Sequence, residues 1–76
     1  FDHEIEHLLR EAINHLPEKC RQVFILSRMN GLRHDEIAER LNISVRTVQN
    51  HIVSALSKFR VELKEYLPLI LFLTFF

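Results

Sequence analysis

The feature that most restricts the fold is a short junction between two amphipathic segments, residues 34–41 and a longer one that begins at Val45. In both segments the apolar residues recur three or four positions apart, which is the spacing of one face of an α-helix. Ser44 directly precedes the second segment and is a good residue to cap a helix N-terminus. Only a few residues separate the two helices, and the small Ala38 lets them cross closely. The pattern predicts a helix-turn-helix over about residues 33–58.

Two further amphipathic helices are predicted upstream of this junction. Pro17 interrupts the first helix and suits the first turn of the second, where its missing N–H costs nothing. The second helix ends at Gly31, which can adopt the left-handed conformation of a helix C-cap. With one Gly, two Pro and no alternating apolar and polar run, the predicted fold class is all-α, a four-helix domain that contains the helix-turn-helix. The side chains expected to face the core are Ile5, Leu8, Leu9, Ala12, Ile13, Leu16, Cys20, Val23, Phe24, Ile25 or Leu26, Met29, Ile37, Ala38, Leu41, Ile43, Val45, Val48, Ile52, Ala55 or Leu56, Phe59 and Leu63.

A chain of 76 residues predicts one domain, but its last residues differ sharply in composition. We assign residues 1–67 to the helix-turn-helix domain and residues 68–76 to a hydrophobic C-terminal tail. From residue 67 onward, every residue except Pro68 and Thr74 is large and apolar. Such a stretch is too short to span a bilayer, which takes about 20 residues, so no membrane span is expected. The sequence leaves open whether the tail covers the core, mediates self-association or docks on a partner.

No residue pattern indicates an enzyme, a cofactor or a metal site. His3 and His7 have a spacing that can hold a metal, but no third or fourth ligand is evident except Asp2 or Glu6, and structural zinc needs four. The single cysteine, Cys20, excludes an internal disulfide and suits a reducing cytosol, so we expect a cytoplasmic protein. The acidic start at Phe1 does not resemble a signal peptide, and we expect the chain to be a piece of a longer protein.

The formal net charge of zero conceals an uneven distribution of charge along the chain. Residues 1–20 carry five of the ten acids, whereas no acid lies between Glu39 and Glu62. For nucleic-acid binding, the local patch matters more than the sum of charges. The helix that begins at Val45 is therefore a candidate DNA-binding element. The basic or titratable residues of the acid-free stretch are Arg40, Arg46, His51, Lys58 and Arg60.

The open face of this helix carries side chains that can read bases. In a helix-turn-helix, the second helix enters the major groove by its N-terminal residues. Gln49 and Asn50 can pair with adenine edges and Arg46 with guanine. Val53 can touch a thymine methyl group. The residues expected to contact the DNA backbone are Arg33, Ser44, Thr47, His51 and Lys58, with Arg60 as a further candidate.

Residues 16–56, LPEKCRQVFILSRMNGLRHDEIAERLNISVRTVQNHIVSAL, resemble the C-terminal domain (region 4) of bacterial RNA polymerase sigma factors. The similarity is greatest to the extracytoplasmic-function group of Bacteroides-like bacteria. It rests on GL…EIAERL, on IS…TV…HI…AL, and above all on LPEKCRQVF, the most discriminating part. The resemblance implies a sequence-specific DNA-binding domain that recognises the upstream (−35) promoter element and supports transcription initiation. It also implies docking on core RNA polymerase (β-flap and β′) and inhibition by an anti-sigma factor.

Carried over residue by residue, the resemblance assigns a role to the open face of the last helix. Thr47 and His51 fall on backbone-contact positions. Many relatives carry Arg where this chain has Gln49, and also where it has Ser54, which leaves the promoter sequence open. Relatives often have Ser or Thr at the position of Arg33, a helix cap that this chain lacks; Arg33 is instead a candidate phosphate clamp. The base-facing positions fall on Arg46, Gln49, Asn50, Val53 and Ser54.

Two alternatives remain open at this point. The DNA-binding domain of two-component and quorum-sensing regulators shares EIAERL…IS…TV…H, but those regulators bind palindromes as dimers and need no polymerase. The second alternative is a protein-interaction module that has lost DNA binding, which the weak overall basicity favours.

Overall fold

The structure, a computed structural model, describes residues 3–64, with side chains from Glu6 onward. The described part is all-α and contains no strand. None of its helices is both long and apolar enough to cross a membrane. The tail, and with it the boundary predicted after residue 67, lies outside the described residues. In chain order the elements are α1 (His3–Asn14), α2 (Glu18–Phe24), the π-helical turn η1 (Ile25–Met29), α3 (His34–Leu41) and α4 (Val45–Glu62).

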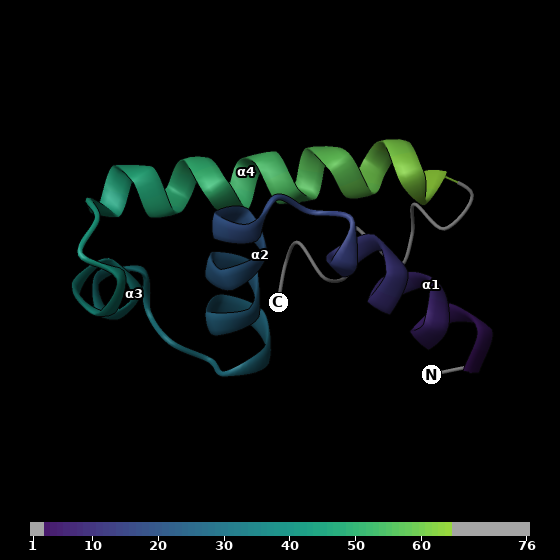
Figure 1. Cartoon of the computed structure of the whole chain (residues 1–76), viewed down its shortest axis with the longest axis horizontal. Helices are drawn as coiled ribbons and strands as arrows, with labels where there is room; N and C mark the ends of the chain where they lie inside the picture. The colour runs from purple at the N-terminus through teal and green to yellow at the C-terminus, as the bar shows by residue number, and fades with distance from the viewer. Residues whose placement is uncertain (1–2, 65–76) are drawn as a thin grey trace.

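The long α4 is the platform on which the other helices pack. Figure 1 shows α1, α2 and α3 on the same side of α4, with α3 near its N-terminal end and α1 toward its C-terminal end. Helix α2 lies between them and meets the middle of α4 steeply. Both α2 and α3 contact α4. One face of α4 is therefore buried along its length, and the opposite face is left open.

The core consists of two clusters that meet along α4. The first joins α1, α2 and the C-terminal half of α4, and the second joins α2, α3 and the N-terminal half of α4. The division follows from the short α2, which offers residues to both sides. The first cluster contains Ala12, Ile13, Leu16, Cys20, Phe24, Ala55, Phe59 and Leu63. The second contains Val23, Ile37, Ala38, Val48 and Ile52.

The end of the second helix carries the glycine cap that the sequence predicts. Gly31 has φ +68°, and the Leu32 N–H donates to the Leu26 carbonyl at 3.0 Å. The donor lies six residues after the acceptor, one residue more than in the usual left-handed glycine cap, because the helix ends in a π-helical turn. The π-helical turn before it was not predicted: the Asn30 N–H donates to the Ile25 carbonyl at 3.1 Å, five residues back.

The turn between α3 and α4 also follows the prediction. Asn42 takes the left-handed conformation, with φ 56° and ψ 47°. The Ile43 N–H then donates to the Ala38 carbonyl at 3.0 Å. Ser44 caps α4, since its Oγ accepts a hydrogen bond from the Thr47 N–H at 3.0 Å. These local bonds place α3 at 34–41 and the start of α4 at Val45, as predicted.

Two side chains predicted to be in the core are instead exposed. Met29 is 62% exposed because the π-helical turn carries an extra residue, so the 3.6-residue spacing no longer gives its face. Val45 is 40% exposed because it is the first residue of α4, and helical side chains lean toward the N-terminus. Ile5 was also predicted to face the core, but its side chain is not among those that the structure describes.

Candidate nucleic-acid interface

The exposed side of α4 gathers four of the five residues assigned to base reading. Arg46, Gln49 and Asn50 are exposed, and Val53 is 66% exposed. Their spacing of three and four residues places them on one helix face. Val48, between them in sequence, is fully buried against α3. The burial of one face therefore holds the other in a fixed orientation toward solvent.

The fifth residue, Ser54, is half-buried at the edge of this face. It lies next to α2, where the Cys20 Sγ–H donates to the His51 carbonyl at 3.2 Å. Burial raises the pKa of the Cys20 thiol, and the Ser54 hydroxyl and the charge of Lys58 partly oppose that shift. The thiol thus anchors α2 to α4 directly behind the exposed residues, a contact that the sequence did not reveal.

A shallow groove runs along α4 beyond the base-reading residues. It has a volume of about 550 Å³. Asn50, Val53 and Ser54 line one end, and Lys58 lies further along it. Lys58 is twelve residues from Arg46, or about 18 Å along the helix at 1.5 Å per residue. The structure therefore brings Lys58 close to the last base-reading residues and separates it from the first.

Ser44 and Thr47 begin α4 and are linked by their own hydrogen bonds. Besides the cap, the two hydroxyls lie 2.8 Å apart. The backbone N–H groups of this first turn form the positive end of the helix dipole, which favours anions. The two residues form the capped N-terminus of α4. They lie at the positive end of its dipole, which attracts anions such as phosphate. His51, a turn later, is half-buried.

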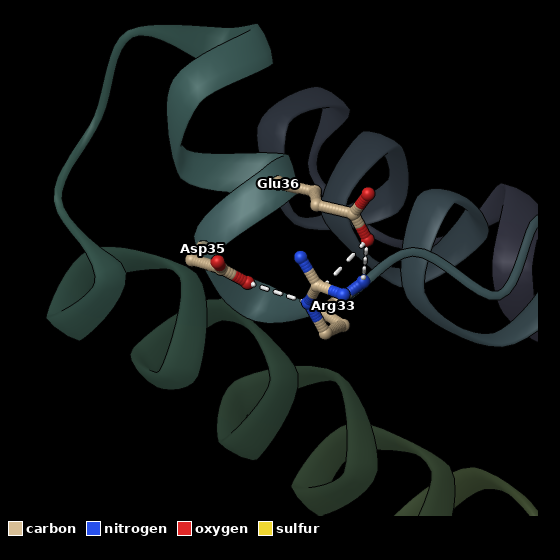
Figure 2. Close-up of polar contacts among 3 residues, drawn as sticks. All are labelled: Arg33, Asp35 and Glu36. Atoms are coloured by element: carbon tan, nitrogen blue, oxygen red, sulfur yellow. Dashed lines mark hydrogen bonds and ion pairs between the residues drawn. The ribbon is translucent and has the colours of Figure 1, made fainter.

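Arg33 precedes α3 and pairs with the acids of the helix that it begins (Figure 2). Its Nε donates to Asp35 Oδ1 at 3.2 Å and lies 3.8 Å from Glu36 Oε1. The same Glu36 oxygen accepts the Arg33 backbone N–H at 2.9 Å. The sequence suggested that α3 lacks a cap, but Glu36 supplies one half of a capping box. Arg33 cannot supply the other half, because a guanidinium has no acceptor.

The pairing shifts the protonation of both partners. The hydrogen bond to Arg33 lowers the pKa of the Asp35 carboxyl, and the bond to Asp35 raises the pKa of Arg33. The three side chains are 43% to 75% exposed, so water screens these charges. Arg33 is therefore held loosely at the N-terminus of α3. Exchanging its acidic partners for another anion costs little free energy.

The ends of α1 and α4 are joined by a contact that sequence spacing could not show. His15 Nδ1 lies 3.0 Å from Glu62 Oε1, across 47 residues of sequence. Glu62 is the acid that ends the acid-free stretch of α4. Among the described side chains, those of residues 6–64, no three His, Cys, Asp or Glu residues lie close enough to hold a metal ion.

Comparison with known proteins identifies the family. A family model described as "Sigma-70, region 4" matches residues 6–59. The ferric citrate uptake sigma factor FecI of Escherichia coli (strain K12) is 34% identical over 58 residues, which is 72% of this chain. The same alignment covers 34% of that relative's length. A comparison with solved structures gave no significant match.

The matched range includes the LPEKCRQVF segment and α2 as well as the helix-turn-helix. That range favours the sigma-factor interpretation over the two-component and quorum-sensing regulators, which share only the later motifs. The chain therefore belongs to the sigma-70 region 4 family, as the DNA-binding domain of an extracytoplasmic-function sigma factor.

Proposed function

We propose that this domain recognises the −35 promoter element and so supports transcription initiation by core RNA polymerase. The observation that carries the proposal is the exposed face of α4. It presents Arg46, Gln49 and Asn50 side by side with Val53, on the second helix of a helix-turn-helix. This is the element that enters the major groove in such motifs. No acid lies on α4 before Glu62 to repel the phosphates.

The base-reading roles follow from the chemistry of each side chain. Arg46 donates two hydrogen bonds to guanine, and Gln49 and Asn50 pair with adenine. Val53 contacts a thymine methyl group. Ser54 is half-buried at the edge of this face, next to α2. It can therefore contact a base only where the DNA comes close to α2. Each good bidentate pair discriminates against the wrong base by about 1–3 kcal/mol.

The phosphate contacts lie on both sides of this reading face. Ser44 and Thr47 hold one phosphate at the N-terminus of α4, and His51 and Lys58 hold others along its flank. Arg33 contacts a phosphate by giving up its bond to Asp35. Because so few cations are involved, the domain alone binds DNA weakly, and its affinity falls with salt only in proportion to those few phosphate contacts. We therefore propose that core polymerase, through its β-flap and β′ subunits, brings the domain to the promoter and that an anti-sigma factor competes for it.

The test is promoter-dependent transcription with core polymerase and the full-length protein that carries this domain. Arg46→Ala and Asn50→Ala should each reduce transcription about 5- to 150-fold, as the loss of about 1–3 kcal/mol predicts. Lys19→Ala is the matched control, since it removes an exposed charge from α2 and leaves α4 intact. Unchanged transcription in both α4 variants would refute the assignment and favour the protein-interaction alternative.

Selection from a randomised DNA pool separates the remaining alternatives. A single asymmetric motif that is enriched only when polymerase is present supports the proposal. A palindromic motif enriched by the purified domain alone would instead indicate a dimeric regulator. Arg46→Ala should relax the preference at one base position, whereas Lys58→Ala should weaken binding to all sequences alike.

A further inference from the structure

The first turn of α3 places two acids beside one of the cations of the candidate nucleic-acid interface. Asp35 Oδ1 accepts the Arg33 Nε–H at 3.2 Å, and Glu36 Oε1 lies 3.8 Å from the same nitrogen. The Glu36 oxygen already accepts the Arg33 backbone N–H at 2.9 Å (Figure 2). Asp35 is therefore the direct partner of the guanidinium, whereas Glu36 mainly holds the backbone at the start of the helix.

This turn carries more negative than positive charge. Residues 33–36 contain one arginine and two acids, so the turn is net negative when His34 is neutral. The hydrogen bond from Arg33 lowers the pKa of the Asp35 carboxyl, so Asp35 stays ionised at neutral pH. In a helix-turn-helix, the first helix crosses the DNA backbone. A phosphate that approaches α3 therefore meets a cation that an acid of the same chain already neutralises.

The pair between Arg33 and Asp35 is weak enough to be replaced. The two side chains are 75% and 66% exposed, and exposed ion pairs contribute little to stability. The pair uses one guanidinium nitrogen, Nε. A phosphate can accept two parallel hydrogen bonds from a guanidinium, which gives a stronger and better oriented contact. DNA can therefore take the place of Asp35, and the strength of the internal pair sets how easily it does so.

We propose that Asp35 is an internal competitor of DNA, which holds Arg33 in an ion pair that a backbone phosphate must displace. The inference rests on the proposed function, because it concerns a phosphate contact of the same interface. Asp35 acts through Arg33 and does not itself contact DNA, so it is a positioning residue. Because phosphate contacts carry no sequence information, Asp35 lowers the affinity for all DNA sequences alike.

The test measures DNA affinity in two titrations of the full-length protein that carries this domain. The protein alone is titrated with a mixed-sequence duplex, and its complex with core polymerase is titrated with a duplex that carries the motif selected from the randomised pool. Asp35→Asn keeps the shape of the side chain and removes its charge. It should raise the affinity about 2- to 5-fold in both titrations, the range that an exposed ion pair is worth.

The contact between Arg33 and a phosphate has its own measurement. Arg33→Ala should weaken binding to both duplexes and reduce the slope of log affinity against log salt by about 1, the value of one phosphate contact. Arg33 and Asp35 are exposed, so their variants should stay folded, and thermal unfolding checks this.

The double variant separates competition for Arg33 from simple removal of a negative charge. The gain from Asp35→Asn should shrink when Arg33→Ala is also present. Glu39→Gln is the matched control, because it removes an exposed acid from the same helix more than one turn further along. It should raise the affinity less than Asp35→Asn does. An equal gain with and without Arg33, an equal gain from Glu39→Gln, or an affinity that stays the same or falls would overturn the proposal.

Arg46→Ala in the same titrations separates failure of this inference from failure of the proposed function. If Arg46→Ala loses the preference for the selected motif while Asp35→Asn does not tighten binding, only the role of Asp35 is refuted. If Asp35→Asn tightens binding through Arg33 while Arg46→Ala keeps the preference, the role of Asp35 stands and base reading by Arg46 is refuted.

Discussion

The rings of Phe24 and Phe59 meet edge to face, with centroids 5.0 Å apart and an interplanar angle of 88°. This contact joins α2 to α4 at the centre of the first core cluster. Phe24 and Phe59 are 4% and 2% exposed. Edge-to-face pairs contribute about 0.5–1.5 kcal/mol beyond the burial of their area. The pair therefore holds the reading helix against the rest of the domain from the side opposite its exposed face.

Phe59→Ala should lower the free energy of unfolding by about 3–5 kcal/mol, because it removes a buried ring and leaves a cavity. Native domains are stable by only about 5–15 kcal/mol, so this variant should be close to unfolding. Urea denaturation followed by circular dichroism measures the change. Val61→Ala, on the exposed side of the same helix, should change the free energy of unfolding by less than about 0.5 kcal/mol. A Phe59→Ala protein as stable as the parent would show that this cluster is not the core.

Asn42 holds a left-handed backbone between α3 and α4, at φ 56°. Asn42→Val should destabilise the domain by about 1–2 kcal/mol, because a branched side chain is strained in that conformation. Asn42→Gly should be tolerated, since glycine adopts positive φ freely. Thermal unfolding of the two variants measures the difference. Equal melting temperatures for Val and Gly would contradict the left-handed turn.

Ser44 caps α4 and is also a proposed phosphate contact. Two different substitutions separate these roles. Ser44→Ala removes the side-chain cap of α4 and should cost about 0.5–2 kcal/mol of stability. Ser44→Asp keeps a capping oxygen, so the melting temperature should stay near that of the parent. It also places a negative charge where we propose a phosphate contact, so DNA affinity should fall. If Ser44→Asp binds promoter DNA as well as the parent does, Ser44 does not contact the backbone.

The Cys20 thiol should react slowly with alkylating reagents. Burial raises its pKa, which lowers the thiolate fraction near pH 8, and the thiolate is the reactive form. The thiol is also 3% exposed and bonded to the His51 carbonyl. Alkylation followed by mass spectrometry should therefore be many times slower in native buffer than in denaturing urea. Equal rates would mean that α2 does not pack against α4 at this point.

The parts of the fold that the sequence predicts best are those fixed by local chemistry. The bounds of α3 and the start of α4 depend on Asn42, Ser44 and the apolar spacing beside them, and all are read within a few residues. Met29 and Val45 were wrongly predicted to face the core. The direction of the Met29 side chain depends on the π-helical turn, and that of Val45 depends on what lies beyond the N-terminus of α4. Periodicity carries neither piece of information.

The candidate site follows the same division. Apart from Val45 and the half-buried Ser54, the spacing showed which side chains of α4 are exposed, since Val48 and Ile52 mark the buried face. Long-range contacts could not be read at all. The bond between Cys20 and the His51 carbonyl depends on how α2 crosses α4, and no pattern in the residues specifies that crossing. Arg33 was recognised by charge, but its pairing with Asp35 depends on rotamers that the sequence leaves free.

The contact between His15 and Glu62 makes one part of the stability depend on pH. The hydrogen bond to Glu62, followed by its negative charge, raises the pKa of His15 above its ordinary 6.5, and the charge of Glu11 adds to the shift. A histidine whose folded pKa is raised stabilises the fold fully below its unfolded pKa. That contribution should be present below about pH 6.5 and lost as the pH rises through the higher folded value. The His15 side chain is 65% exposed, so added salt should weaken the effect.

Substitutions at either end of this contact test its dependence on pH. His15→Gln should lower the melting temperature at pH 5.5 and have little effect at pH 8.5. Glu62→Gln should do the same, and the double variant should be no worse than either single one, because one contact is lost in all three. Thermal unfolding across this pH range measures the changes, and NMR titration of the His15 ring gives its pKa directly. A ring that titrates below 6.5, or two effects that simply add, would show that α1 and α4 are not joined through this pair.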